Sequence, residues 1–277
     1  MNWFEKLLHL LQVKMKTPVT FGWFHILCIV ITFLSIIFLY FNRKKYDEKQ
    51  LKIVLGIYGI GTLILELAKQ LIWSFNYDPA TALVTWDYQW YAAPFQLCTT
   101  PMYVSIICLF LKKNKIRDGL LSYIAFFTIL GSIATIIMPD SCFTSDVLIN
   151  IHTMYLHCGS LVLSIYLLFT KEVDLRLKNL LSGFYVFLIL VSIANSMNIT
   201  FYKTRIIGDE TFNMFYISPY FISILPIYDT IQKSMPYVVF LLIYLISIYL
   251  GGNIIYLIAI GIDELTKRLK KMLDSKN

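Results

Sequence analysis

The sequence predicts an all-α polytopic membrane protein: one transmembrane domain over residues 1–277, folded as a seven-helix bundle. The chain is 58% hydrophobic and 15% charged, with a mean hydropathy of +0.67, whereas soluble domains are usually ~45–50% apolar and ~25% charged. Apolar runs of spanning length recur along the whole chain, and most Lys and Arg lie between them. This composition excludes a disordered chain and, despite the net charge of +7, a nucleic-acid-binding protein.

The seven expected spans are apolar runs close to the ~20 residues that cross a bilayer core. In chain order they lie at 21–41, 53–73, 93–111, 119–138, 149–170, 180–197 and 236–260. The first run is followed by Arg43 and Lys44 and by no small-residue cleavage site, so we expect it to be a retained span. Residues 2–13 are amphipathic and predict a helix in the outer interface. The 198–235 stretch is long, aromatic and mixed in polarity.

The distribution of basic residues predicts the orientation. Most of the 24 Lys and Arg lie in the loops after the first, third and fifth spans and in the C-terminal tail. The loops 74–92 and 139–148 contain acidic residues and no Lys or Arg. Because basic loops stay in the cytoplasm, the N-terminus is expected outside and the C-terminus inside. We therefore expect a multi-pass protein of the plasma membrane.

Polar side chains within the spans gather near their outer ends. The set comprises Glu66, Lys69 and Gln70 in the second span, Gln96, Cys98 and Thr99 in the third, His157 in the fifth and Asn195 in the sixth. At 1.5 Å per residue, Glu66, Cys98 and His157 fall roughly 8–12 Å below the outer boundary. The inner halves of the spans are nearly purely apolar. This asymmetry predicts a polar chamber open to the outer leaflet rather than a continuous pore.

Cys98 and His157 supply a nucleophile and a general base for acyl transfer. A thiolate at Cys98 attacks a lipid ester and leaves an acyl-thioester that a second lipid accepts. Gln96, Asn195 or a backbone N–H of the kinked segment is suited to hold the developing oxyanion, and Glu66 to orient His157. The alternative for Glu66 is a structural pair within its own helix, neutralised by Lys69 or Gln70.

A metal site is the competing interpretation of the same residues. Its donors would be drawn from Cys98, His152, His157 and Cys158. However, His157 and Cys158 are adjacent and point about 100° apart on a helix, so they cannot both face one ion. We therefore expect neither a metal nor another cofactor. A disulfide between Cys142 and a second outer cysteine also remains open.

At these motifs the chain resembles the YwaF-like bacterial integral membrane proteins, relatives of a mammalian transmembrane phospholipid acyltransferase. The resemblance covers most of the chain and is carried by three motifs. These are Gln-Leu-Cys-Thr-Thr-Pro at 96–101, His-Cys-Gly at 157–159, and Phe-Asn-Met-Phe-Tyr at 212–216, which includes Asn213. Family members usually have His where this chain has Gln96.

The resemblance implies Cys98 and His157 as the catalytic pair. It implies acyl-CoA-independent transfer of a fatty acyl chain between phospholipids, which serve as donor and acceptor. The residues expected to bind or orient the substrate are Glu66, Gln70, Gln96, Thr99, Asn195 and Asn213. The alternatives are a transporter of a lipid or small solute, a membrane scaffold or sensor, and, among enzymes, a lipid hydrolase.

Overall fold

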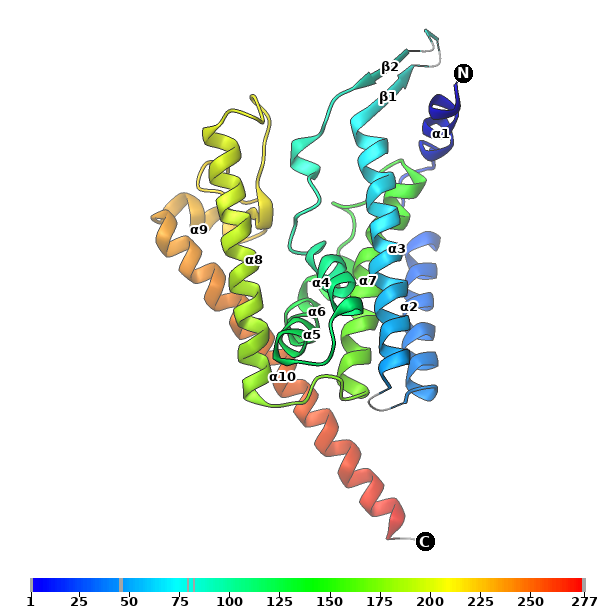
Figure 1. The fold of residues 1–277 in the computed structure, drawn as a ribbon, viewed down its shortest axis with the longest axis vertical. Coiled ribbons are helices and arrows are strands. Elements are labelled where there is room, and N and C mark those ends of the chain that lie inside the picture. The colour runs from blue at the N-terminus through cyan, green and yellow to red at the C-terminus, as the bar shows by residue number, and fades with distance from the viewer. Residues whose placement is uncertain (1, 45–46, 79, 82, 276–277) are drawn as a thin grey trace.

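The computed structural model describes residues 2–44, 47–78, 80–81 and 83–275, and within them the chain is mostly helical (Figure 1). Lys45, in the basic loop after the first expected span, lies outside the described residues. The elements are α1 (Trp3–Leu11), α2 (Trp23–Phe41), α3 (Glu48–Ser74), β1 (Phe75–Asp78), β2 (Leu83–Trp86), the 3-10 turn η1 (Trp90–Ala92), α4 (Thr100–Phe110), α5 (Lys115–Phe127), α6 (Ile129–Ile137), α7 (Val147–Phe169), α8 (Leu177–Lys203), the 3-10 turn η2 (Met214–Tyr216), α9 (Tyr228–Ser234) and α10 (Tyr237–Asp274).

Side-chain caps fix several helix starts. Asn2 and Glu5 form a reciprocal capping box on α1, so two backbone N–H groups that lack helical partners are satisfied. The Asp47 side chain accepts from the first turn of α3, and Asn114 does the same for α5. These short polar residues precede the first turns of their helices and accept from backbone N–H groups that have no helical partner.

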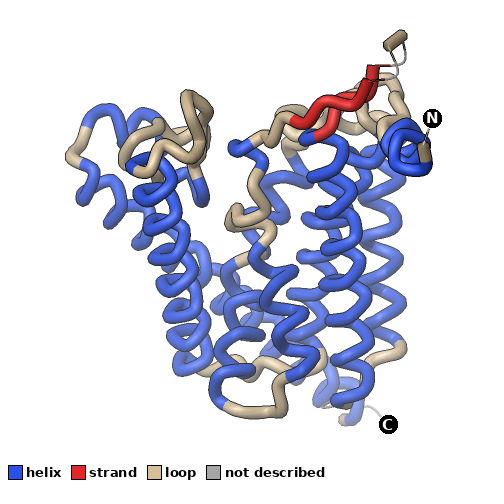
Figure 2. The backbone as a smooth tube through the Cα atoms, turned by 45° about the horizontal axis from the view of Figure 1, so that its top comes forward, coloured by secondary structure: helices blue, strands red, loops and turns tan. Residues whose placement is uncertain are grey.

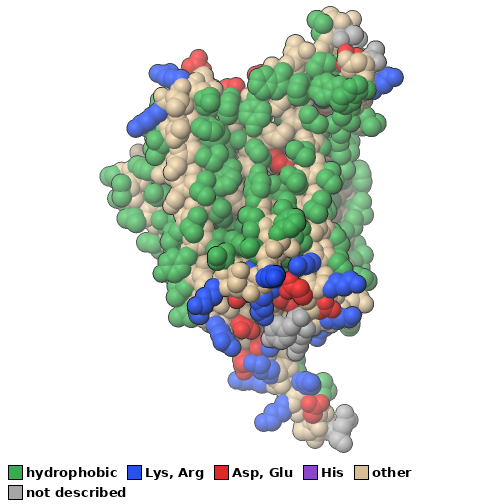
Figure 3. Space-filling view, in the orientation of Figure 1, with side chains coloured by type: hydrophobic (Ala, Val, Ile, Leu, Met, Phe, Trp, Pro, Cys, Tyr) green, Lys and Arg blue, Asp and Glu red, His purple; other side chains and the backbone are tan. Residues whose placement is uncertain are grey.

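Helix α3 packs against α4 on one side and α7 on the other. Helix α2 packs on α7, while α5 packs on α7 and most extensively on α8. Figures 1 and 2 show α1 and the β1–β2 hairpin at one end of the bundle, and the C-terminus at the opposite end. We call the first the hairpin end. Figure 3 shows an apolar belt around the middle and Lys and Arg gathered toward the C-terminal end.

The expectation of a multi-pass helical membrane protein is confirmed at the level of its class. Among the described residues, six helices are long and apolar enough to span a membrane: α2, α3, the α5–α6 stretch, α7, α8 and α10. The expected span at 93–111 is not one continuous helix. Residues 93–99 are irregular, and α4 has 11 residues, too few to cross a ~30 Å core.

Two prolines explain the shortened third helix. Pro94 has no backbone N–H to donate and disfavours helical backbone in the residue before it. Pro101 lies in the first turn of α4, where no intrahelical partner is needed for its missing N–H. The helix therefore begins at Thr100, and the chain before it runs as turns.

Other boundaries also differ from the expected ones. The loop 74–92 contains the antiparallel hairpin β1–β2, with Phe75 opposite Trp86. Helix α8 continues to Lys203 and α10 to Asp274, because polar residues on an exposed helix face do not end a helix. The N-terminal helix α1 lies within its expected range 2–13.

Candidate active site

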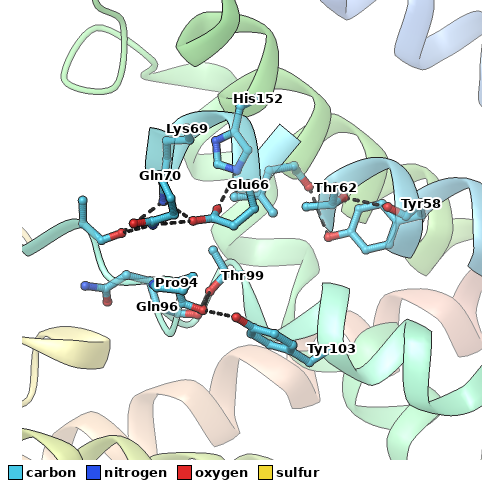
Figure 4. Close-up of polar contacts among 12 residues, drawn as sticks. Tyr58, Thr62, Glu66, Lys69, Gln70, Pro94, Gln96, Thr99, Tyr103 and His152 are labelled. Carbon is cyan, nitrogen blue, oxygen red and sulfur yellow. Dashed lines mark hydrogen bonds and ion pairs between the residues drawn. The ribbon is translucent and has the colours of Figure 1, made fainter. Parts of the chain in front are cut away.

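A cluster of charged and amide side chains is buried near the hairpin end of α3. Glu66 is 2% exposed and Lys69 7% exposed. The Lys69 Nζ lies 2.6 Å from Glu66 Oε1, and Gln70 Nε2 donates to the same oxygen over 2.8 Å. His152 of α7 brings its Nε2 within 2.8 Å of Glu66 Oε2. Figure 4 shows the three side chains converging on the carboxylate. We call Glu66, Lys69, Gln70 and His152 the α3–α7 cluster.

Helical periodicity brings this cluster together. Residues at i, i+3 and i+4 lie on one helix face, so Lys69 and Gln70 lie beside Glu66. The face points toward α7, against which α3 packs, and His152 lies there five residues into α7. A carboxylate buried in an apolar bundle is costly unless paired. Here a cation, an amide and an imidazole surround it.

The α3–α7 cluster also holds the irregular chain before α4. Ala92 O accepts from Lys69 Nζ over 3.2 Å and from Gln70 Nε2 over 2.9 Å. A backbone carbonyl left free by the interrupted helix therefore finds partners in two α3 side chains. The segment 92–99, which carries Cys98, is thus tied to α3.

Turn hydrogen bonds shape the segment around Cys98. Pro94 O accepts from Tyr103 Oη over 2.7 Å and from Thr99 Oγ1 over 3.2 Å. Thr99 Oγ1 also donates to Gln96 O over 2.8 Å, as Figure 4 shows. The Thr99 hydroxyl therefore stabilises this turn through the Pro94 and Gln96 carbonyls. Thr99 is 3% exposed, directly beside the thiol-bearing residue.

Gln96 joins the same segment to η2. Its Nε2 donates to Asn213 O over 3.1 Å, and its Oε1 accepts from Phe215 N over 2.9 Å. Phe215 has φ +59°, an unusual backbone for a bulky residue. The Asn213 side chain accepts from Ser218 N over 2.8 Å and so fixes the turn after η2. Gln96 and Asn213 thus lie together, and their side chains hold backbone groups of η2 and the turn after it.

Cys98 is half-buried and directly precedes Thr99, the N-cap of α4. All five cysteines are free, so no disulfide involves Cys142 or Cys98.

His157 lies buried on α7, ten residues from the start of the helix. Within the described residues its ring makes no hydrogen bond, and the nearby His152 acts on it electrostatically. The structure therefore places His152, and not His157, against Glu66. Cys98 and His157 lie on segments that both border α3.

Asn195 lies apart from these residues. Its Oδ1 accepts from Tyr237 Oη over 2.7 Å, which joins α8 to the start of α10. Tyr237 Oη also donates to Ile217 O over 2.9 Å. Asn195 is therefore engaged in helix association. Within the described ranges, no group of three or more His, Cys, Asp or Glu is placed to hold a metal ion.

Sequence reasoning missed the contact of His152 with Glu66. The available signal was the cost of an unpaired carboxylate in a membrane span, which requires a partner for each oxygen. Lys69 and Gln70 both contact Oε1, which leaves Oε2 to face α7, where His152 Nε2 lies 2.8 Å away. His152, on a span that α3 contacts, was the available side chain.

The fold and the site define a polytopic α-helical membrane protein with a buried polar centre near one end of its bundle. The chain matches the model of the TMEM164 family over residues 19–256, and so it belongs to the TMEM164 family. No curated protein and no solved structure matches it.

Proposed function

We propose that the protein is a membrane acyltransferase that moves a fatty acyl chain between phospholipids through a thioester on Cys98. The observation that carries the proposal is the placement of this thiol. It lies half-buried two residues before α4, on a segment that the α3–α7 cluster holds by Ala92 O. The resemblance to YwaF-like proteins and to a mammalian phospholipid acyltransferase supports the same chemistry.

The reaction has two matched steps. His157 accepts the Cys98 proton while the sulfur attacks the ester carbonyl of the donor lipid. The carbon–oxygen bond breaks, the proton passes to the leaving lipid alkoxide, and a lysophospholipid departs. An acceptor lysophospholipid then attacks the thioester through its hydroxyl, and the proton returns to the thiol. An ester is both consumed and formed, so acyl-CoA and ATP are not required.

We place the reaction at the outer leaflet of the plasma membrane. The basic residues of the loops and tail gather toward the end of the bundle that lies opposite the hairpin (Figure 3), and basic loops face the cytoplasm. The α3–α7 cluster lies toward the hairpin end, because Glu66 is eight residues from the last residue of α3. That orientation favours donors and acceptors drawn from the bilayer.

The test is acyl exchange by purified protein in phosphatidylcholine vesicles with a labelled donor and a lysophospholipid acceptor. Cys98→Ala should abolish exchange, whereas Cys142→Ala, a change at another free half-buried thiol, should leave it unchanged. Full exchange by folded Cys98→Ala protein contradicts the proposal. Release of free fatty acid in place of transfer would assign a hydrolase to the same thiol.

A further inference from the structure

We propose that a groove between α2, α3 and α7 holds one acyl chain of a membrane phospholipid. The inference rests on the proposed function and deepens it, because it assigns a part of the lipid substrate to a named surface. The groove has a volume of about 810 Å³, within the ~300–1,000 Å³ that single-ligand sites enclose.

Helix packing forms the groove. Helices α2 and α3 each pack on α7, and the groove lies between them. Its lining includes Phe24 and Ile31 from α2, Val54 and Tyr58 from α3, and Tyr155 and Gly159 from α7. A Cβ at Gly159 would lie 2.8 Å from the Tyr58 ring, so the missing side chain lets that ring lie against α7.

The hydroxyl groups of the lining already have hydrogen-bond partners within the protein. Thr32 Oγ1 donates to Cys28 O over 2.7 Å, and Ser35 Oγ donates to Ile31 O over 2.8 Å. Tyr155 Oη donates to Ile57 O over 2.6 Å. These hydroxyls thus have partners on the protein, and the groove favours a hydrocarbon chain over a headgroup.

The dimensions fit a lipid tail. From Phe24 to Leu39 the α2 wall runs about 22 Å at 1.5 Å per residue. One leaflet of a ~30 Å hydrocarbon core is about 15 Å deep, the depth that an acyl chain fills. A tail held here extends from one leaflet past the midplane. All three helices are candidate spans, so the groove faces hydrocarbon along its length.

The groove approaches the candidate site through Tyr58. The Tyr58 ring lines the groove, and its hydroxyl donates to Leu156 O over 3.4 Å, one residue before His157. On α7, Ile151 lines the groove and is adjacent to His152 of the α3–α7 cluster. A chain in the groove therefore has its carbonyl end directed toward the hairpin end, where the thiol lies.

The direct test is photo-crosslinking of the purified full-length chain in phosphatidylcholine vesicles. The probe is a phosphatidylcholine with a diazirine at the end of one acyl chain, and adducts are mapped by peptide mass spectrometry. Adducts should concentrate on the groove-lining residues of α2, α3 and α7. Adducts spread equally over the exposed apolar residues of α10 would overturn the proposal.

A matched pair of variants sharpens this test. Ile31 lines the groove and is 53% exposed, whereas Ile246 on α10 is 56% exposed and lies outside it. Ile31→Trp should lower groove adducts several-fold by filling the space, and Ile246→Trp should not. Both positions are exposed, so neither change buries a larger ring in a packed core. Undiminished groove adducts in Ile31→Trp protein would refute the assignment.

Crosslinking of Cys98→Ala protein separates the two proposals. Occupancy of an apolar groove does not require the thiol, so the adducts should persist in this variant. Groove adducts together with exchange by Cys98→Ala protein would leave the groove standing and refute the catalytic role. Exchange that requires the thiol, together with adducts spread uniformly over the protein, would support the catalytic role of Cys98 and refute the groove.

Discussion

At the residue scale, the defining feature is a carboxylate placed within an apolar bundle. Glu66 is 2% exposed and has a partner on each oxygen, with Lys69 at 2.6 Å and His152 at 2.8 Å. Removing one member of a buried pair usually costs about 3–5 kcal/mol, because the other charge stays buried alone. The cluster therefore supports the fold and at the same time fixes the segment that bears the candidate nucleophile.

This predicts the response to neutralising the carboxylate. Glu66→Gln leaves the Lys69 ammonium without its counter-charge and should lower the thermal unfolding midpoint in detergent micelles. Glu66→Gln combined with Lys69→Met should recover part of the loss, because no charge then remains unpaired. Glu264→Gln on the exposed part of α10 is the control and should unfold like wild type. Glu66→Gln protein that unfolds at the same temperature as wild type would contradict the pairing of Glu66 with Lys69.

Gln96 allows a second prediction at this scale. Its amide donates to Asn213 O and accepts from Phe215 N, whereas a carboxylate can only accept. Gln96→Glu should therefore leave Asn213 O unpaired and reduce acyl exchange, at a cost of about 1–3 kcal/mol in unfolding free energy. Glu264→Gln on the exposed part of α10 is again the control. Equal unfolding midpoints for Gln96→Glu protein and wild type would argue against this link.

The sequence predicts which positions are polar within the spans, but not how those side chains pair. The polar positions were identifiable because charges and amides are rare in membrane spans. Their pairing was not, because His152 and His157 lie five residues apart on one helix, and the pattern alone does not say which one meets Glu66. The rotation of α7 against α3 decides it. Asn195 was grouped with the site by depth alone, although it bonds Tyr237.

At the element scale, glycines set how closely helices approach. A Cβ at Gly183 of α8 would lie 2.8 Å from the backbone of Ser122 and Tyr123 in α5. A Cβ at Gly131 of α6 would meet nothing within 4 Å. Both glycines are helical, so the two sites differ in helix contact and not in backbone conformation.

Alanine substitution should therefore act oppositely at these two positions. Gly183→Ala forces α5 and α8 apart and should destabilise the protein by about 1–3 kcal/mol or more. Gly131→Ala should be neutral or stabilising by up to about 1 kcal/mol, because alanine favours a helix. Thermal unfolding of the two variants side by side measures this. Equal midpoints would show that α5 and α8 are not in this contact.

The helical elements were largely predictable because apolar runs and flanking polar residues mark the spans. The third expected span, 93–111, is a continuous helix only from Thr100 to Phe110, because two prolines seven residues apart interrupt its first part. Pro94 and Pro101 leave turns at 93–99, and these turns carry Cys98. The α5–α8 contact was not predictable either, since it depends on which helix faces meet.

At the scale of the whole molecule, the bundle is asymmetric along its axis. The α3–α7 cluster lies toward the hairpin end, and the loops and tail rich in Lys and Arg lie toward the other (Figure 3). Basic loops at one end and the candidate site near the other are the arrangement that the proposed reaction at the outer leaflet requires. The charged and polar residues of this largely apolar chain are thus distributed unevenly along the bundle axis.

Cysteine accessibility in intact cells tests this orientation. In a Cys142→Ser background, Thr81→Cys near the hairpin tip should react with a membrane-impermeant maleimide. Lys112→Cys, on the opposite side, should react only after the cells are permeabilised. Both residues are exposed, so accessibility depends on the side of the membrane. The inverse labelling pattern would place the reaction in the inner leaflet.

Peptide mass spectrometry after an acid quench detects a covalent acyl intermediate on Cys98 directly. Protein in vesicles should carry the donor's acyl mass on the peptide containing Cys98, and neutral hydroxylamine should remove it. Added lysophospholipid should discharge it with formation of the labelled product lipid. Acyl exchange that proceeds with no acyl mass on Cys98 would contradict the account.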